Sequence, residues 1–264
     1  MMAMGVKGEG VRLMLAIAQS PHSFAERVAR FLSRVEYRRA ETEIELDAIL
    51  RLRHDAYLKE GAIPPNSSRR LEDSFDDVDN VYNFGIFVDG ELGNAIRLHV
   101  LSNIGQRSPA MESFGEFLVP KLSAGKLIID PNRFVANYKL ARLYPELPYV
   151  TLRLTYLACK FFEADIMTMT VRAEHQAFYR RGFFADLVCP PRPYPLLSKP
   201  ISLLFIDFPR DSERLAERYP FSASSEAERK ALFGEGPTRV RSGGAMTATI
   251  PLDATMPPLK LIAR

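Results

Sequence analysis

The sequence predicts an α/β fold in which helices flank one sheet, and three observations support this prediction. Two β-prone runs, residues 83–88 and 95–100, are joined around Asp89-Gly90, a pair that suits a tight hairpin turn. Residues 127–208 alternate between strand-like and helical apolar patterns. The chain has 264 residues, of which 47% are hydrophobic and 25% charged, as in ordinary globular proteins. This composition excludes the disordered, collagen-like and disulfide-scaffold classes.

The N-terminal elements follow from the spacing of apolar residues. Residues 1–34 are predicted to be an N-terminal helical extension, because four apolar residues share one helical face there: Phe24, Val28, Phe31 and Leu32. Residues 35–43 are strand-like but polar. Residues 44–59 have the pattern of a helix, which a glycine and a proline pair terminate. Residues 66–80 then form a polar loop rich in carboxylates before the hairpin.

The second half of the chain supplies the other strands and helices. A strand is predicted from residue 127 to 135, and a helix at 149–163 has Pro148 at its start. The next predicted elements are a strand at 165–171, a helix at 174–181, a strand at 201–208 and one or two helices within 212–233. Residues 35–209 are therefore expected to form the main domain. Residues 210–264 are expected to be a helical or partly disordered tail, because the periodicity fades there.

Cysteine usage and apolar runs indicate the compartment. Cys159 and Cys189 provide neither a disulfide framework nor a CxxC pair, so a reducing cytoplasm is expected. The apolar run at 13–18 is shorter than a signal peptide needs, and no stretch approaches the ~20 apolar residues of a transmembrane segment. Glycine-rich phosphate loops, a nucleophile elbow and histidines at metal-ligand spacing are also missing from the sequence. We therefore expect no metal site and no tightly bound cofactor.

Charge is unevenly distributed along the chain, although the formal net charge is only +3. Residues 35–132 contain 17 acidic and 11 basic side chains, whereas residues 133–199 contain 10 basic and 5 acidic ones. If these segments stay apart in space, one side of the domain is basic and attracts an acidic partner; if they intermix, the bias is lost. The basic residues form no continuous basic helix and no nucleic-acid-binding motif, so nucleic-acid binding is not expected.

Two arginines lie at positions that the patterns predict to be apolar. Arg53 lies on the apolar face of helix 44–59, and Arg97 alternates with apolar residues in a β-run. Burying a guanidinium is costly unless carboxylates pair with it, so partners such as Asp73, Asp76 or Asp130 are expected in a buried ionic cluster. Such pairs would equally serve to brace the acidic loop against the sheet.

Taken in order, these segments resemble a known family. Four of them resemble the front half of the acyl-homoserine-lactone synthases, a branch of the GNAT-like acyltransferases: LRHDAY (52–57), EDSFDDVDN (72–80), AIRLHV (95–100) and IDPNRFVA (129–136). A more specific resemblance, to the long-chain N-acyl amino acid synthases, rests on further segments: EGAI (60–63), NFGIFVDG (83–90), YPELPY (144–149) and EHQAFYRRGF (174–183). The resemblance covers about residues 36–208.

The resemblance implies a fold and an activity. The fold would be GNAT-like, with a mixed, mostly antiparallel sheet split at its central strands. The activity would be an N-acyltransferase that moves a long-chain acyl group from the phosphopantetheine thioester of an acyl carrier protein to the amino group of an amino acid. Three alternatives stay open: an acetyl-CoA-dependent N-acetyltransferase, an acyl-homoserine-lactone synthase and a non-enzymatic binding protein of the same fold.

The resemblance also assigns roles to residues. Asp130 is expected to act as a general base through a water, and Arg97 or Arg133 to bind the acceptor carboxylate. Tyr179 is expected to protonate the leaving thiolate. Arg53, Asp73 and Asp76 complete the charged cluster beside the acceptor, and the backbone N–H groups of Phe134, Val135 and Ala136 would stabilise the oxyanion. An apolar tunnel for the acyl chain is expected to be lined by Phe161, Phe162, Met167, Met169 and Leu204.

The sequence departs from the family patterns at several places. Asp130 stands where the lactone synthases have Glu, and the absence of Trp counts against lactone synthase activity. Tyr179 lies three residues before Gly182, where the common pattern has four. His99 lies on the same face of its strand as Arg97. It either assists proton removal or is a core histidine whose hydrogen bonds are satisfied within the protein. Residues 133–148 contain no glycine, which disfavours a bare backbone loop around a pyrophosphate and favours a carrier protein over free coenzyme A.

Overall fold

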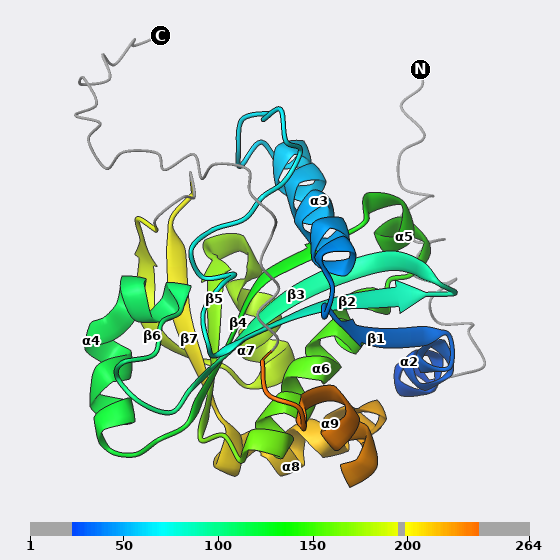
Figure 1. Cartoon of the computed structure of the whole chain (residues 1–264). Coiled ribbons are helices and arrows are strands. Elements are labelled where there is room, and N and C mark those ends of the chain that lie inside the picture. The colour runs from blue at the N-terminus through cyan, green and yellow to red at the C-terminus, as the bar shows by residue number, and fades with distance from the viewer. Residues whose placement is uncertain (1–22, 195–198, 238–264) are drawn as a thin grey trace, which may run out of the picture.

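The computed structural model describes residues 23–194 and 199–237, and these residues form one seven-stranded sheet flanked by helices (Figure 1). Only β4 and β5 pair in parallel; all other neighbouring strands are antiparallel. The predicted mixed, mostly antiparallel sheet is therefore confirmed. From one edge to the other, the strands are β1 (Val35–Arg39), β2 (Val81–Val88), β3 (Glu91–Leu101), β4 (Ile128–Ala136), β5 (Ile166–Arg172), β7 (Ile201–Asp207) and β6 (Asp186–Arg192).

The sheet is split between β4 and β5, as predicted. These strands pair only at Ile128 with Ile166 and at Ile129 with Met167. Beyond these pairs the strands separate, and a bulge interrupts the pairing of β4 with β3 near Arg133, whose φ is 51°. The gap beyond Ile129 and Met167, which we call the split, leaves backbone groups of β4 without a strand on that side.

Six of the eight described α-helices begin at a residue whose side chain caps them. Ser23 and Thr42 each form a capping box, and Ser108, Asn137, Asp207 and Ser225 accept hydrogen bonds from backbone N–H groups of their helices. Two 3-10 turns, Ala173–His175 and Pro220–Ser222, complete the described elements. The helices are α2 (Phe24–Leu32), α3 (Glu43–Lys59), α4 (Pro109–Ser123), α5 (Tyr138–Leu143), α6 (Leu147–Phe162), α7 (Gln176–Phe183), α8 (Phe208–Arg218) and α9 (Glu226–Phe233).

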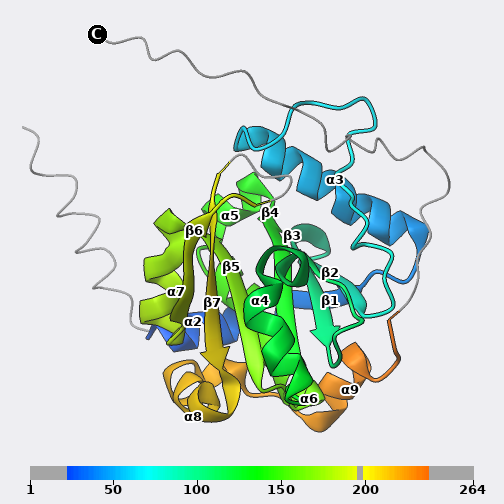
Figure 2. The same ribbon diagram turned by 90° about the vertical axis from the view of Figure 1, so that its left-hand side faces the viewer.

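The two faces of the sheet differ in chemistry. One face packs in a continuous apolar core with α6, to which α2, α8 and α9 also contribute (Figure 1). The opposite face has two smaller apolar clusters, one beneath α3 and one beneath α4 (Figure 2). Between these clusters lies a row of buried polar side chains: Asn83, Arg97, His99, Asp130 and Thr168. Because successive side chains of a strand point to opposite faces of the sheet, one face is apolar and the centre of the other face is polar.

The flanking segments share the main core. Val28 and Phe31 of α2 are buried there, and Phe221 and Phe233 lie in the same cluster from the C-terminal side. The predicted division at residues 34 and 209 stays a prediction, and residues 1–22 and 238–264 lie outside the described residues. None of the helices in the described ranges is long and apolar enough to cross a membrane.

Candidate active site

Five side chains predicted to form a charged cluster come together on the α3 side of the sheet. Arg53 Nη1 of α3 lies 2.7 Å from Asp76 Oδ1, and Arg97 Nη1 of β3 lies 2.7 Å from Asp73 Oδ1 and 2.8 Å from Asp76 Oδ1. Arg133 Nη2 of β4 lies 2.5 Å from Asp73 Oδ2. We call these five residues the arginine cluster. It joins a helix, two strands and the loop at 66–80.

The acidic loop is shaped to present both carboxylates inward. Asp73 Oδ1 accepts a hydrogen bond from the Phe75 amide, and the Asp73 amide donates to Asp76 Oδ2 at 3.0 Å. Phe75 is buried with its ring edge toward His99, and Arg107 lies over the same ring. The loop is therefore held by its own turn and by an aromatic anchor.

The charges of the arginine cluster do not cancel. Burial alone would raise the pKa of the Asp73 carboxyl, but the guanidinium groups of Arg97 and Arg133 outweigh burial and hold that pKa well below its usual range. For Asp76, burial is likewise outweighed, here by Arg53 and Arg97, so its pKa is also lowered. Both carboxyls are ionised at neutral pH, so three guanidinium groups face two carboxylates. Counted by themselves, these five side chains carry a net charge of +1.

Arg133 has the most exposed guanidinium of the cluster. The side chains of Arg53 and Arg97 are 0% exposed, whereas that of Arg133 is 11% exposed. Arg97 already donates to Asp73, Asp76 and Asn132. Arg133 donates to Asp73, interacts with the Tyr57 hydroxyl and lies over the Tyr57 ring at 5.3 Å. Its remaining donors are suited to a carboxylate ligand.

A neutral network, which the sequence did not reveal, positions Arg97. Arg97 Nε donates to Asn132 Oδ1 at 2.7 Å, and Asn132 Nδ2 donates to His99 Nδ1 at 3.0 Å. His99 Nε2 then donates to the Phe75 carbonyl at 3.1 Å. Burial, together with Arg97, lowers the pKa of His99 to about 3, so the imidazole is neutral. His99 is thus a satisfied core histidine and not a proton acceptor.

Asp130 lies apart from the ion pairs of the arginine cluster. No described arginine forms a salt bridge with it; Asp130 Oδ1 accepts from Thr168 Oγ1 of β5 at 2.7 Å, and Oδ2 accepts from the Ala110 amide of α4 at 3.2 Å. Asp130 is therefore not the ion-pair partner of Arg53 or Arg97 that the sequence suggested. Burial raises the pKa of its carboxyl, and the hydrogen bonds it accepts oppose that shift only in part.

Tyr179 lies on the other side of the sheet from the arginine cluster. It packs on α7 against Phe178 and Phe183, beside the main apolar core. Burial raises its pKa to about 12, so the phenol keeps its proton at neutral pH. The structure does not bring Tyr179 into contact with the charged residues.

A narrow apolar cavity lies on that side, between α6, β5 and the C-terminal segment. The cavity is tight: its enclosed free volume is about 20 Å³, and it reaches about 380 Å³ only when all the space between atoms and the open space at its mouth are counted. Met167 and Met169, two of the predicted tunnel residues, line the cavity from β5. Phe161 and Phe162 do not line it, because they pack around Phe233, and Leu204 is an ordinary core residue. We call this space the apolar cavity.

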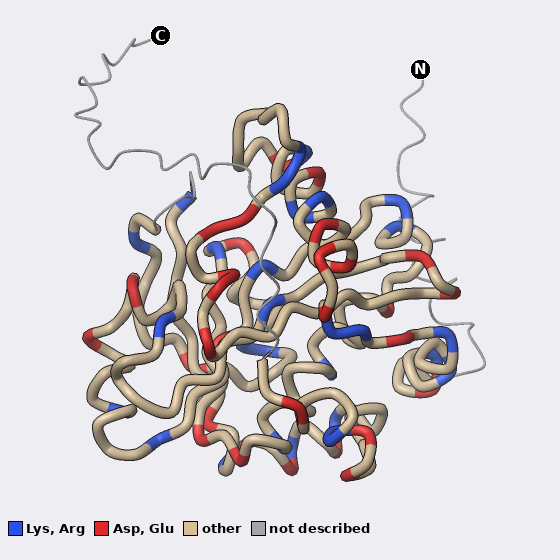
Figure 3. The backbone as a smooth tube through the Cα atoms, viewed as in Figure 1, with Lys and Arg blue, Asp and Glu red and all other residues tan. Residues whose placement is uncertain are grey.

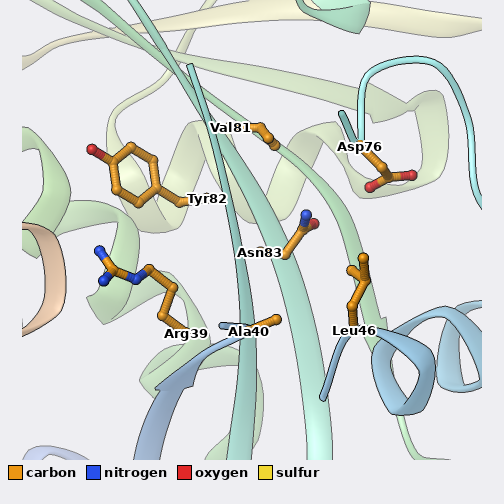
Figure 4. A pocket seen from close by; sticks show the side chains of 7 residues that line it. All are labelled: Arg39, Ala40, Leu46, Asp76, Val81, Tyr82 and Asn83. Carbon is orange, nitrogen blue, oxygen red and sulfur yellow. The ribbon is translucent and has the colours of Figure 1, made fainter. Parts of the chain in front are cut away.

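A second pocket lies at the β1–β2 edge of the arginine cluster (Figure 4). Its charged and amide side chains are Arg39, Asp76 and Asn83, and its enclosed free volume is only about 10 Å³. Arg39 is already paired with Glu41 at 2.7 Å, and Asp76 with the buried arginines. The charged side chains of this pocket are therefore already paired, so the pocket is less suited than Arg133 to bind a charged ligand.

The N-terminal end of α6 is poorly suited to bind a pyrophosphate. Glu146 occupies the N-cap position without a side-chain capping bond, and Pro148 removes a backbone donor from the first turn. Of the two spatial arrangements of charge that the sequence left open, Figure 3 shows the intermixed one, with acidic and basic residues distributed together over the fold. In the described residues, no group of three or more His, Cys, Asp or Glu side chains is placed to hold a metal ion.

Comparisons with known proteins agree with this geometry. The family model described as "N-acyl amino acid synthase FeeM" matches residues 48–207, more than half of the chain. The structure of FeeM, an N-acyl amino acid synthase from uncultured soil microbes, has 17% identity and a TM-score of 0.57, and the match covers 67% of this chain and 92% of FeeM. This similarity supports the GNAT-like fold.

Two further solved structures are similar at lower TM-scores. An acyl-CoA N-acyltransferase from Pseudomonas aeruginosa has 19% identity and a TM-score of 0.45, covering 65% of this chain and 98% of that one. The acyl-homoserine-lactone synthase LasI has 15% identity and a TM-score of 0.47, covering 77% and 95%. A comparison with curated protein sequences finds no match.

Proposed function

This chain belongs to the FeeM family of N-acyl amino acid synthases, and on that premise we propose that it transfers a long-chain acyl group from an acyl carrier protein to an amino acid. One observation carries the proposal. The sheet splits between β4 and β5, with a net positive arginine cluster on one face and an apolar cavity on the other. The acceptor amino acid, through its carboxylate, and the apolar acyl chain of the donor can therefore approach the split from opposite faces of the sheet.

The acceptor's carboxylate binds Arg133 in this proposal. A guanidinium and a carboxylate form two parallel charge-assisted hydrogen bonds, and the ligand compensates the positive charge of the arginine cluster. Arg97 is less suited to this role, because it is fully buried and its donors already bind Asp73, Asp76 and Asn132. Arg97, Arg53 and the two aspartates position Arg133 from behind.

The donor's thioester carbonyl lies in the split, with its acyl chain in the apolar cavity. Met167, Met169 and Phe183 offer the apolar contacts there. The backbone of Phe134, Val135 and Ala136 flanks the split, and N–H groups that point toward the missing strand would stabilise the tetrahedral oxyanion. Tyr179, which follows β5, is proposed to donate the proton that the leaving thiolate takes up.

Asp130 is proposed to accept the proton from the acceptor's ammonium group through a water. The neutral amine then attacks the thioester carbonyl carbon and the carbon–nitrogen bond forms. As the carbon–sulfur bond breaks, the nitrogen releases its second proton to solvent, and the leaving thiolate takes a proton from Tyr179, which solvent then reprotonates. The raised pKa of Asp130 makes it a stronger base than an exposed carboxylate. Its bond to Thr168 holds the carboxyl across the start of the split.

A carrier protein is favoured over free coenzyme A as the donor. The glycine-free connection before α6, together with Glu146 and Pro148, provides little for a pyrophosphate to bind. Exposed cations on α5 and α7, which follow the diverging ends of β4 and β5, suit an acidic carrier: Lys139, Arg142, Arg180 and Arg181. None of these four forms an ion pair with a described carboxylate. The phosphopantetheine thioester is then a co-substrate, and no tightly bound cofactor is proposed.

The test supplies purified protein with the same long-chain acyl group on carrier protein or on coenzyme A, together with the common amino acids. Mass spectrometry should detect N-acyl amino acids, formed faster from the carrier thioester. Turnover with acetyl-CoA alone would identify an N-acetyltransferase instead. Free thiol without an amide, or no turnover with any thioester, would contradict the proposal.

A further inference from the structure

We infer that the C-terminal segment after the family region, residues 219–233, forms a wall of the acyl site and sets which acyl chain lengths the enzyme accepts. The inference rests on the proposed function, since it takes the apolar cavity as the acyl site. The family model ends at residue 207. The wall therefore lies outside the residues that the family model matches.

Three residues of this segment line the apolar cavity directly: Tyr219, Phe221 and Ser222. Leu152 of α6 and Met169 of β5 line the same cavity. Phe221 is 8% exposed and Ser222 is 5% exposed, so they are interior surfaces and not a loose flap. An acyl chain that enters from the split has to fit against these side chains.

The wall extends along the cavity. Tyr219 lies near Tyr149 at the start of α6, with their ring centroids 5.9 Å apart. Ser222 lines the cavity together with Tyr156, seven residues further along the same helix. At ~1.5 Å of rise per residue, this separation is roughly 10 Å along α6. The segment therefore borders the cavity from near the split toward its deeper end, where a longer chain would have to extend.

A buried guanidinium fixes the wall in place. Arg153 of α6 donates from Nε to the Phe221 carbonyl and from Nη2 to the Ala223 carbonyl, each at 2.7 Å. Its Nη1 lies 2.7 Å from Glu228 Oε1 of α9. Phe233, 2% exposed, anchors the end of α9 in the main core. Such a wall is rigid, and rigid apolar walls discriminate between chain lengths.

The experiment compares acyl-chain preference between variants that differ in the wall alone. Straight-chain acyl thioesters that increase by two carbons are supplied on carrier protein with one fixed amino acid, and relative kcat/KM is measured. Phe221→Ala should shift the optimum to chains longer by roughly two to four carbons, because it opens space beside the cavity. Ser222→Leu should shift it to shorter chains. Discrimination between neighbouring lengths should change by about tenfold or more.

Phe233→Ala is the matched control. It removes the same side chain from the same segment, but Phe233 packs on Tyr82, Phe84, Phe161 and Phe162 and does not line the cavity. It should lower thermal stability and leave the length profile unchanged. If Phe221→Ala does not fold by circular dichroism, Phe221→Leu replaces it, with a smaller shift in the same direction.

The outcomes separate this inference from the proposed function. If the wild type forms amides but the folded wall variants keep its length profile, the inference is overturned and the proposed function stands. A profile shift in Phe233→Ala as large as that in Phe221→Ala would also overturn it. If the wild type forms no amide from any thioester, the proposed function itself fails.

Discussion

Substituting Arg133 by Gln removes the most exposed guanidinium of the arginine cluster and keeps a polar side chain in its place. In the native protein Arg133 Nη2 binds Asp73 Oδ2 at 2.5 Å. Asp73 keeps two hydrogen bonds from Arg97, at 2.7 and 3.2 Å, after the substitution. The fold should therefore lose only about 1–3 kcal/mol, because no carboxylate is left buried without a cation.

The loss at the acceptor should be specific and measurable. A hydrogen bond to a charged group contributes about 1.5–3 kcal/mol, which corresponds to a roughly 10- to 150-fold rise in the acceptor KM. Initial rates are measured against amino acid concentration at saturating acyl thioester, and then against thioester. The thioester KM should stay within twofold or so of wild type. Arg133→Lys should recover part of the loss, because it keeps the charge without the planar fork.

Arg97→Gln is the comparison that separates binding from structure. Arg97 is fully buried and pairs with both Asp73 and Asp76, so its loss leaves buried carboxylates undercompensated and should cost about 3–5 kcal/mol of unfolding free energy. A folded Arg133→Gln enzyme with an unchanged acceptor KM would refute the reasoning. In that case Arg39→Gln would test whether the polar pocket of Figure 4 holds the carboxylate instead.

Three further predictions concern protons and charge. The pKa of His99 is about 3 in the folded protein and near 6.5 in the unfolded chain. The contribution of neutral His99 to the free energy of unfolding is therefore fully present above pH 6.5 and is lost as the pH falls, by about 2 kcal/mol at pH 5. Urea unfolding of His99→Gln should lack this decline. Thr168→Val removes a hydrogen bond that lowers the pKa of Asp130, so the acidic limb of the pH–rate profile should move to higher pH. Reversing the charges of Arg180 and Arg181 to Glu should raise the KM for acyl carrier protein about tenfold at low salt and leave a small pantetheine thioester unaffected.

Each of these predictions has a contradicting result. An unchanged pH dependence of unfolding in His99→Gln would mean that folding does not lower the pKa of His99. A pH–rate profile that does not move in Thr168→Val would remove Asp130 as the titrating base. Equal effects of the Arg180 and Arg181 reversals on carrier-bound and small thioesters would mean that these cations act on the site and not on the partner.

Helices and strands whose apolar residues recur at a regular spacing were predictable from the sequence, whereas elements interrupted by glycine or proline were not. The Asp89-Gly90 turn has φ values of 50° and 83°, as the hairpin prediction requires. No element was predicted over α4, because Gly115 and Pro120 interrupt its period and the helix is kinked at Phe114, where φ is −136°. β6 was also missed, because Pro190 and Pro191 disguise a strand that is tolerated only at the sheet edge.

The charged half of the site was predictable because burying a guanidinium demands carboxylates. That requirement identified Asp73 and Asp76 as partners of Arg53 and Arg97. Asn132 carries no charge and gave no comparable signal, although it orients Arg97. The bulge at Arg133 was also hidden, and simple strand alternation does not describe β4 beyond it.

The placement of the two substrate sites on opposite faces depends on tertiary packing. Met167 and Met169 alternate with Thr168 on β5, so periodicity alone separates them into two faces. Which face carries the cavity depends on where α6 and the C-terminal segment pack. Phe161 and Phe162 have the same apolar character as Met169, yet they pack around Phe233 instead of lining the cavity.

The central claim is that the acceptor and the acyl chain reach the split from opposite faces of the sheet. A crystal structure with a bound N-acyl amino acid product tests it most directly. The account predicts the product carboxylate within hydrogen-bond distance of Arg133 on the α3 face, the amide in the split, and the acyl chain between Met169 and Phe221 on the α6 face. A product whose carboxylate and chain lie on the same face of the sheet, or whose chain avoids the apolar cavity, would contradict it.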